Sequence, residues 1–225
     1  FSKIDRYGYQ DWWHNDQLAF QKGYTTDVIT SNGIDFIKQH KKQPFFLYLA
    51  HLGVHFPWQS PDDENLQTRI QGEDFTSNKP GSHSKVGPHQ PKDVPEILKE
   101  MIESLDKNVG RLVEYLEAEG LDKNTLIFFT SDNGQYLNYD GSTWPKVGSN
   151  GVLRGEKGDL YEGGHRVPAI AYWPEKIPEN VISDAPLMSM DILPTLLEII
   201  GSPMPNQNGN HALDGTSFLN VLTQK

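Results

Sequence analysis

The chain has 225 residues, of which 36% are hydrophobic, and its formal net charge is −10. The hydrophobic content is sufficient for a folded core and excludes a disordered chain, while the negative charge makes nucleic acid and anionic membranes poor partners, because both bind clustered cations. Cysteine is absent, which excludes disulfides and thiolate metal ligands, and no apolar run approaches the ~20 residues of a membrane span.

The first predicted elements are a helix and a strand. Apolar residues at helical spacing predict a helix over residues 25–40, although Gly33 weakens the pattern. Residues 45–50 form a short apolar run after a proline and predict a buried strand. Residues 51–58 then lie at its C-terminal end or in the loop beyond.

A long loop and the longest helix follow. Residues 59–91 are rich in Pro, Gly, Ser, Asn and His and predict a long loop, a type of segment that often carries function. Apolar residues at three- and four-residue spacing predict a helix over residues 93–119, and Gly120 supplies its stop signal.

The second half predicts two further strands and a short helix. "TLIFFT", residues 125–130, reads as a strand that ends in a polar turn, and "VPAIAYWP", residues 167–174, as another. Residues 189–201 predict a short helix, with Pro194 in its first turn and Gly201 at its end. This alternation of helices and strands indicates the α/β class, with helices packed against a sheet.

Asp132 and Asn133 come directly after a predicted strand. Ligands in open α/β sheets bind beyond the carboxyl ends of strands, and side-chain oxygens of Asp and Asn suit a hard divalent cation. Two ligands are too few for a calcium site. An Asx-type turn at Asp-Asn-Gly, which needs no metal, is the alternative.

Two histidines and a lysine are further candidates. His51 and His55 follow another predicted strand and are either catalytic or packed beside Trp58. Lys157 is flanked by glycines, so it is able to approach an anion closely or simply to face solvent. Glu162 is an acid/base candidate or pairs with a nearby arginine to fix its loop.

Together these motifs resemble the sulfatase family of the alkaline-phosphatase-like superfamily, in particular its arylsulfatase and N-acetylgalactosamine-6-sulfatase branch. The likeness covers roughly residues 18–203. The motifs that carry it, in chain order, are "PFFLYLA" with "HFP", "SDNG", "GSNGVLRGEKGDLYEGGHRVP" and "MDILPTLLEIIG".

The resemblance implies roles for individual residues. Asp132 and Asn133 match the family's second pair of calcium ligands. Lys157 matches the lysine that holds a sulfate oxygen, and His55 matches the histidine on the sulfate or leaving-group side. Other matches, which include Glu162, Gly163, Gly164, Arg166 and Asp191, are structural.

The chain departs from the family's pattern at the nucleophile. The family's nucleophile is a formylglycine made from the Cys or Ser of a C/S-x-P-x-R motif, and no stretch of this chain fits that motif. The family's first pair of calcium-binding aspartates is also missing, because Asp62 and Asp63 lie in the wrong place. We therefore expect this chain alone to be inactive and its partners to include the missing N-terminal half of the same domain.

The resemblance implies an α/β fold, an alkaline-phosphatase-like sheet flanked by helices and incomplete at its N-terminal side. Residues 1–225 would be the C-terminal portion of a sulfatase catalytic domain, and residues 204–225 would begin a C-terminal subdomain or tail. The parent protein would be a calcium-dependent sulfuric ester hydrolase that acts on a sulfated small molecule or glycan. A phosphatase or phosphonate hydrolase of the same superfamily, or an inactive domain that binds sulfated glycans, are alternatives.

Substrate contacts are expected from the loop 59–91 and from residues 135–151. The candidates for contact with a sugar or leaving group are Trp58, Trp144, Asn150 and Arg154. Family members are usually exported or lysosomal, so the resemblance also implies an extracytoplasmic location.

Overall fold

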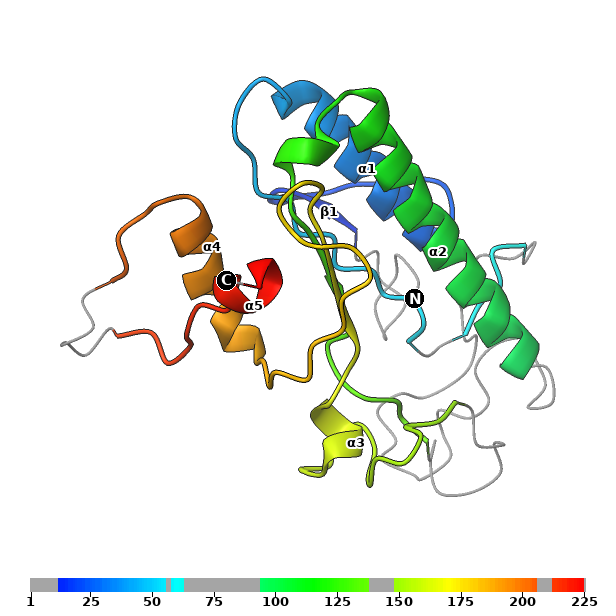
Figure 1. The fold of residues 1–225 in the computed structure, drawn as a ribbon. Helices are drawn as coiled ribbons and strands as arrows, with labels where there is room; N and C mark the ends of the chain where they lie inside the picture. Colours follow the sequence, from blue (N-terminus) through cyan, green and yellow to red (C-terminus); the bar gives the residue numbers. More distant parts are fainter. Residues whose placement is uncertain (1–11, 56–57, 63–93, 138–147, 206–211, 225) are drawn as a thin grey trace. The chain divides into compact units, whose positions relative to one another are not determined.

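The structure is a computed structural model, and its described residues form two compact units (Figure 1). The first unit contains Phe1–Glu119 and Ser131–Val167, and the second contains Gly120–Thr130 and Pro168–Lys225. The residues that the structure describes are 12–55, 58–62, 94–137, 148–205 and 212–224.

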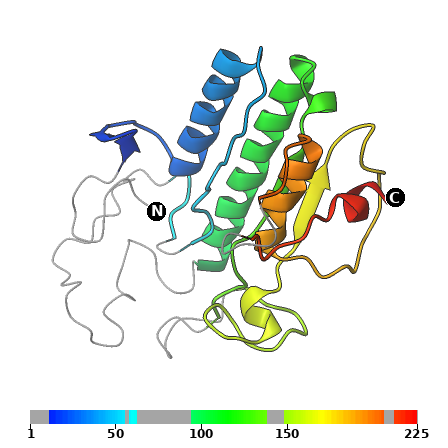
Figure 2. The same cartoon turned by 90° about the vertical axis from the view of Figure 1, so that its left-hand side faces the viewer.

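The first unit is built on two long helices that lie side by side (Figures 1 and 2). Helix α1 spans Thr25–His40 and helix α2 spans Val94–Ala118, which confirms both predicted helices. Buried apolar side chains of α1 include Val28 and Ile37, and those of α2 include Met101 and Leu116. Their spacing gives each helix the apolar stripe that was evident in the sequence.

A buried polar network also joins the two helices. Asn108 of α2 is 1% exposed, and its Nδ2 donates to the carboxylate of Asp27 in α1 over 2.6 Å. Arg111 donates to the Oδ1 of Asn108 over 2.7 Å and to the hydroxyl of Ser31 over 3.1 Å. Each buried polar group of Asn108 is therefore satisfied, as burial requires.

The segment after α1 is extended but is not a paired strand, which corrects the prediction for residues 45–50. Phe45, Leu47 and Leu49 are half-buried, whereas Phe46 and Tyr48 are 72% and 79% exposed. The segment runs beside α1 (Figure 2). A Cβ on Gly33 of α1 would come within 2.8 Å of a side-chain carbon of Leu49. The alternation of a strand is present, but no described segment forms a ladder with it.

Two small elements of the first unit were not predicted. Strands β1, Trp13–His14, and β2, Gln17–Leu18, form an antiparallel hairpin in which Trp13 pairs with Leu18. Helix α3, Glu162–His165, is a single turn that carries two buried glycines.

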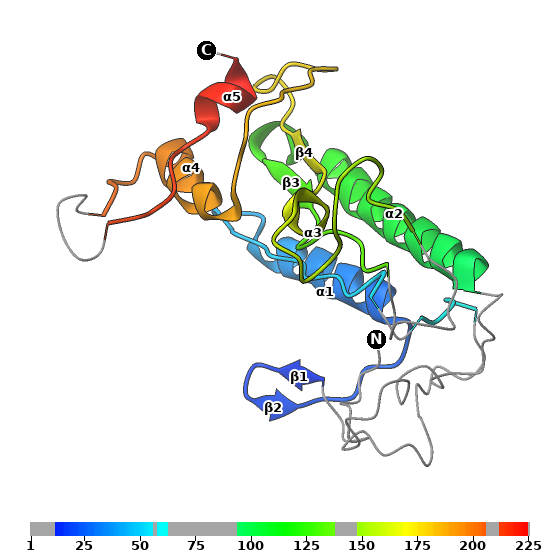
Figure 3. The same ribbon diagram turned by 90° about the horizontal axis from the view of Figure 1, so that it is seen from below.

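The second unit contains one antiparallel strand pair. Strand β3, Ile127–Thr130, pairs with β4, Ala169–Tyr172 (Figure 3). Ile127 lies opposite Tyr172 in this pair. Both strands were predicted. Ile170 is 64% exposed and Phe129 is 41% exposed, in a sheet that has two strands among the described residues.

The other regular elements of the second unit are short helices. The 3-10 turns η2, Asp122–Asn124, and η4, Ser189–Asp191, precede β3 and helix α4 respectively. Helix α4, Ile192–Ile199, confirms the predicted short helix, and α5, Leu219–Thr223, packs near it (Figure 3). The expected start of a subdomain at residue 204 stays a prediction.

A hydrogen bond fixes the approach of the chain to α5. Thr195 of α4 is 1% exposed. Its hydroxyl accepts the backbone N–H of Phe218 over 2.9 Å and donates to the carbonyl of Asp191 over 2.7 Å. The buried ring of Phe218 lies 6.0 Å from the ring of Phe128 on β3, so this contact joins α5 to the sheet.

Candidate functional site

Three segments of the first unit meet at a crossing of glycines, which we call the glycine crossing and define as Gly134, Gly155, Gly163 and Gly164. The N–H of Gly134 donates to the carbonyl of Gly164 over 2.9 Å, and the N–H of Gly163 donates to the carbonyl of Arg154 over 2.7 Å. A Cβ on Gly134 would overlap the carbonyl oxygen of Gly163, and a Cβ on Gly163 would overlap that of Gly155. Only residues without a side chain let backbones approach so closely.

The predicted metal ligands Asp132 and Asn133 directly precede this crossing. In the alternative Asx turn, a side-chain oxygen accepts the N–H two residues later. The N–H groups that such turns would use, those of Gly134 and Gln135, donate to other acceptors. The N–H of Gly134 donates to the carbonyl of Gly164 in α3, and that of Gln135 donates to the Oδ1 of Asn150 over 2.9 Å. The triplet is therefore held in place by other segments, which leaves its side-chain oxygens outside an Asx turn.

The oxygens of Asp132 and Asn133 suit a hard cation. The Nδ2 of Asn133 donates to the carbonyl of Gly134 over 2.9 Å, so its Oδ1 is the atom left for a ligand. Asp132 is exposed, and its carboxylate makes no hydrogen bond or ion pair with any residue that the structure describes. No group of three or more His, Asp or Glu side chains among the described residues is arranged for a metal. The pair thus fits part of the coordination of calcium, which takes six to eight oxygens.

Lys157 lies next to this segment through its backbone. Its N–H donates to the carbonyl of Gln135 over 3.1 Å. Gly155 and Gly158 flank it with φ of +86° and +96°, a region that favours glycine. The side chain is half-buried, and within the described part of the chain its ammonium has no hydrogen-bond or ion-pair partner. A cation held this way is suited to bind an anion.

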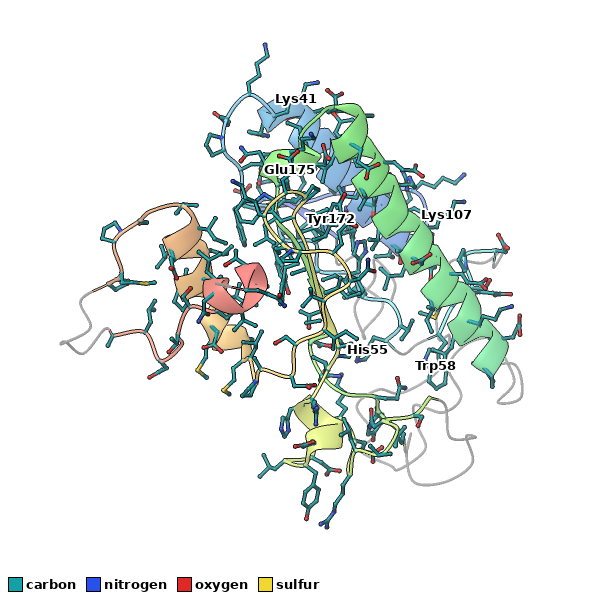
Figure 4. The ribbon with its side chains drawn as sticks, viewed as in Figure 1. Lys41, His55, Trp58, Lys107, Tyr172 and Glu175 are labelled. Carbon is teal, nitrogen blue, oxygen red and sulfur yellow. The ribbon has the colours of Figure 1, made fainter. Side chains whose placement is uncertain are left out.

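His55 lies in the loop that follows the extended segment. Its N–H donates to the carbonyl of Leu52 over 2.8 Å, and its imidazole is exposed (Figure 4). An exposed imidazole is accessible to a ligand, as general acid catalysis requires. Its catalytic role stays a prediction.

His51 and Trp58 are packing residues in this structure. Trp58 is 6% exposed and packs with Ile97 and Met101 of α2 (Figure 4). Burial lowers the pKa of His51, and its Nδ1 is buried without a hydrogen-bond partner among the described residues. A ring as buried as that of Trp58 offers little surface to a sugar, so its burial does not favour the expected substrate contact. That contact stays a prediction.

The amide of Asn150 is used inside the chain. Its Oδ1 accepts the N–H of Gln135, and its Nδ2 donates to the carbonyls of Gln135 over 3.1 Å and of Gly155 over 3.0 Å. Both hydrogens of Nδ2 are thereby donated, and the amide has no donor left for a substrate. The structure shows an internal contact where the sequence predicted contact with a substrate.

The remaining candidates lie around α3 or outside the described residues. The guanidinium carbon of Arg154 lies 3.7 Å from the centroid of the Tyr161 ring, which holds this cation on the aromatic face. Arg166 and Glu162 form an ion pair of 3.0 Å one turn apart, as the structural alternative for Glu162 expected. Trp144 lies outside the described residues. The substrate roles of Trp144 and Arg154 stay predictions.

Sequence reasoning missed Gln135 and Glu156 as organising residues. The backbone of Gln135 bonds both Asn150 and Lys157, and the carboxylate of Glu156 accepts the N–H of Leu137 over 2.5 Å. No spacing rule pairs these positions. The density of glycines between residues 148 and 164 was the one signal that backbones approach closely here.

Comparison with known proteins identifies relatives over most of the chain. The family model described as Sulfatase matches residues 2–202. Arylsulfatase A of Bos taurus is 35% identical over 205 residues, which are 91% of this chain and 32% of that protein. The N-acetylgalactosamine-6-O-sulfatase of Bacteroides thetaiotaomicron is 28% identical over 218 residues, which are 95% of this chain and 36% of that protein.

A solved structure is similar in fold. The crystal structure of Ps i-CgsB in complex with k-i-k-neocarrahexaose superimposes with a TM-score of 0.70 at 28% identity, and it covers 94% of this chain and 41% of that chain. The likeness supports the alkaline-phosphatase-like fold that the sequence predicted. The chain spans about a third of the length of the curated relatives that it matches.

Proposed function

The chain belongs to the sulfatase family, and from this premise we propose that the protein containing it hydrolyses a sulfate ester. One observation supports this proposal above others. The half-buried ammonium of Lys157 has no partner within the described residues, and its backbone is bonded to the segment that carries Asp132 and Asn133. A cation and two cation-binding oxygens on adjoining segments suit the anionic group of a sulfate ester, whose oxygens carry the negative charge.

We propose that Asp132 and the Oδ1 of Asn133 hold calcium together with oxygens from outside the described residues. The family implies the use of a metal, and the oxygen donors of this pair fit a hard cation. A bound calcium ion would offset the negative charge of the sulfate oxygens.

The side chains of this chain have separate tasks in the proposed reaction. Lys157 binds and orients a sulfate oxygen, because its charge opposes the charge that builds there. His55 donates a proton to the leaving oxygen from its exposed imidazole. Neither residue attacks sulfur. The nucleophile is proposed to be a formylglycine, for which this chain has no precursor motif, so residues 1–225 alone are expected to be inactive.

The proposed substrate is a sulfate ester on a glycan. The relative from Bacteroides thetaiotaomicron is named for N-acetylgalactosamine 6-O-sulfate, and the similar crystal structure holds k-i-k-neocarrahexaose. An extracytoplasmic location, where sulfated glycans occur, accompanies this proposal. No helix among the described residues has the length and apolar character to cross a membrane.

Hydrolysis assays with the native protein that contains this chain test the proposal. Release of sulfate from para-nitrophenyl sulfate and from sulfated galactosamine is compared with release of phosphate from para-nitrophenyl phosphate. Chelation should abolish sulfate release, and calcium should restore it better than magnesium, because a site of flexible oxygen ligands suits the larger ion.

Two substitutions sharpen the test. Lys157→Ala should lower kcat/KM about 100-fold to 1,000-fold, the usual loss when one group that stabilises a transition state is removed. Lys107→Ala, on the exposed side of α2, is the matched control and should leave activity unchanged (Figure 4). Preferential phosphate release would support the phosphatase alternative instead. Binding of a sulfated sugar without hydrolysis would support the inactive binding domain.

A further inference from the structure

One side chain, that of Asn150, connects the segment of the predicted metal ligands to the segment of Lys157. Its amide makes two hydrogen bonds with the backbone of Gln135, one as acceptor over 2.9 Å and one as donor over 3.1 Å. A third bond, of 3.0 Å, reaches the carbonyl of Gly155, two residues before Lys157. The amide thus bonds both segments at once.

The carbonyl of Gln135 is the point at which these bonds converge. It accepts from Nδ2 of Asn150 over 3.1 Å and from the N–H of Lys157 over 3.1 Å, which uses both of its lone pairs. Gln135 follows Asn133 by two residues. A shift of Asn150 therefore moves the lysine segment relative to the predicted metal ligands.

We propose that Asn150 is a positioning residue for sulfate ester hydrolysis, which fixes Lys157 relative to Asp132 and Asn133. This inference rests on the proposed function, because it assigns the same reaction to Lys157. Asn150 touches neither the ester nor the leaving group. It acts through backbone contacts alone, since its two donors are both occupied.

The residue type follows from the contacts. An aspartate at position 150 would keep the oxygen that accepts from Gln135 but would lose both donors and place a carboxylate against two carbonyl oxygens. An alanine would remove all three bonds without that repulsion. Asn150→Asp should therefore loosen the two segments at least as much as Asn150→Ala.

Hydrogen exchange tests the contact without any reference to catalysis. In the native protein that contains this chain, Asn150→Ala should raise exchange at the amides of Gln135 and Lys157 by about 10-fold or more. The amide of Gln135 loses its acceptor on Asn150, and the amide of Lys157 donates to the Gln135 carbonyl that Asn150 no longer holds. Exchange in α1 and α2 should not change. Val152→Ala is the control, since Val152 is 100% exposed on the same loop. Unchanged exchange at both amides would overturn the proposal.

Kinetics then test the effect on the reaction. Asn150→Ala should lower kcat/KM for a sulfate ester about 10-fold to 100-fold, mostly through kcat, because small misplacements of a catalytic group cost about that much. Lys157→Ala should lower activity less in the Asn150→Ala background than in the wild type, since the two residues act as a unit. A residue with a merely structural role would give equal losses in both backgrounds.

The exchange and kinetic experiments together distinguish a failure of the positioning role from a failure of the proposed function. Raised exchange with equal kinetic losses overturns the positioning role while sulfatase activity stands. A wild-type protein that hydrolyses no sulfate ester overturns the proposed function and the kinetic role of Asn150 together. In that case raised exchange would still show that Asn150 holds the two segments together.

Discussion

Asn108 and Asp27 are 81 residues apart, yet the amide of Asn108 donates to the carboxylate of Asp27 over 2.6 Å between α2 and α1. The contact is buried, since Asn108 is 1% exposed. Apolar stripes allow two helices to slide along each other, whereas a hydrogen bond between fixed positions sets their register. This pair therefore specifies how the two long helices of the first unit pack.

Asn108→Ala should lower the free energy of unfolding by about 2–3 kcal/mol, because it removes a hydrogen bond to a charged group and leaves that group less well paired. Urea denaturation of the native protein measures the loss. Lys107→Ala, one residue away on the exposed side, should change the free energy of unfolding by less than about 0.5 kcal/mol. Equal losses of unfolding free energy in the two variants would show that the Asn108 contact does not stabilise the packing of the helices.

Gly163→Ala should lower the free energy of unfolding by about 2–3 kcal/mol, because the new Cβ would collide with the backbone carbonyls of Gly155 and Arg154. Backbone atoms cannot swing away as a side chain does. Gly110→Ala is the matched control in α2, where a Cβ meets no atom within 4 Å. It should stabilise the protein by about 0.5–1 kcal/mol. Thermal unfolding distinguishes the opposite signs of the two changes.

Thr195→Val keeps the shape of the side chain but removes the hydroxyl that accepts from Phe218 and donates to Asp191. A buried N–H without an acceptor costs about 1–3 kcal/mol, so the unfolding midpoint should fall. Limited proteolysis should also cleave the variant closer to α5 than it cleaves the wild type. Thr216→Val, at an exposed position, is the control and should leave both measurements unchanged. If the two variants behave alike, the hydroxyl of Thr195 does not hold α5 in place.

The burial of His51 makes stability depend on pH. Because burial lowers its pKa, the folded state stays neutral where the unfolded chain, with the usual pKa of about 6.5, already binds a proton. Stability is therefore lost as pH falls through the unfolded pKa toward the lower folded one. His51→Gln should lose less stability than the wild type between about pH 7.5 and pH 5.5.

Denaturation at these two pH values gives the comparison. Val54→Ala is the control, because it removes packing near Trp58 without removing a group that titrates. It should lower stability equally at both pH values. An identical pH dependence in the wild type and His51→Gln would assign the effect to other groups.

Sequence patterns predicted the elements that depend on one segment alone. The stripes of α1 and α2 and the strands around Ile127 and Ala169 were found because apolar spacing is a local property. The segment around Leu47 was expected to be a buried strand, because an apolar run does not say whether a neighbouring strand is present. Its alternating exposure shows an extended chain that lies along α1 on one side only.

The candidate site was predictable as residue types but not as an arrangement. Asp132, Asn133 and Lys157 were found from strand ends, glycine flanks and family motifs. Their connection through Gln135 and Asn150 could not be predicted, because it consists of hydrogen bonds to backbone atoms, which any residue type offers. Asn150 was expected from the sequence to contact a substrate, and only the three-dimensional structure shows its bonds to Gln135 and Gly155.

The glycine crossing has a consequence for the detection of pseudoenzymes. Gly134, Gly163 and Gly164 are required by the closeness of three backbones, whatever chemistry the protein performs. A paralogue that lost Lys157 or Asp132 would need the same glycines to fold. Searches keyed on the Glu-Gly-Gly triplet would therefore collect inactive paralogues together with working hydrolases, and under the proposed function Lys157 and Asp132 are the positions that would separate them.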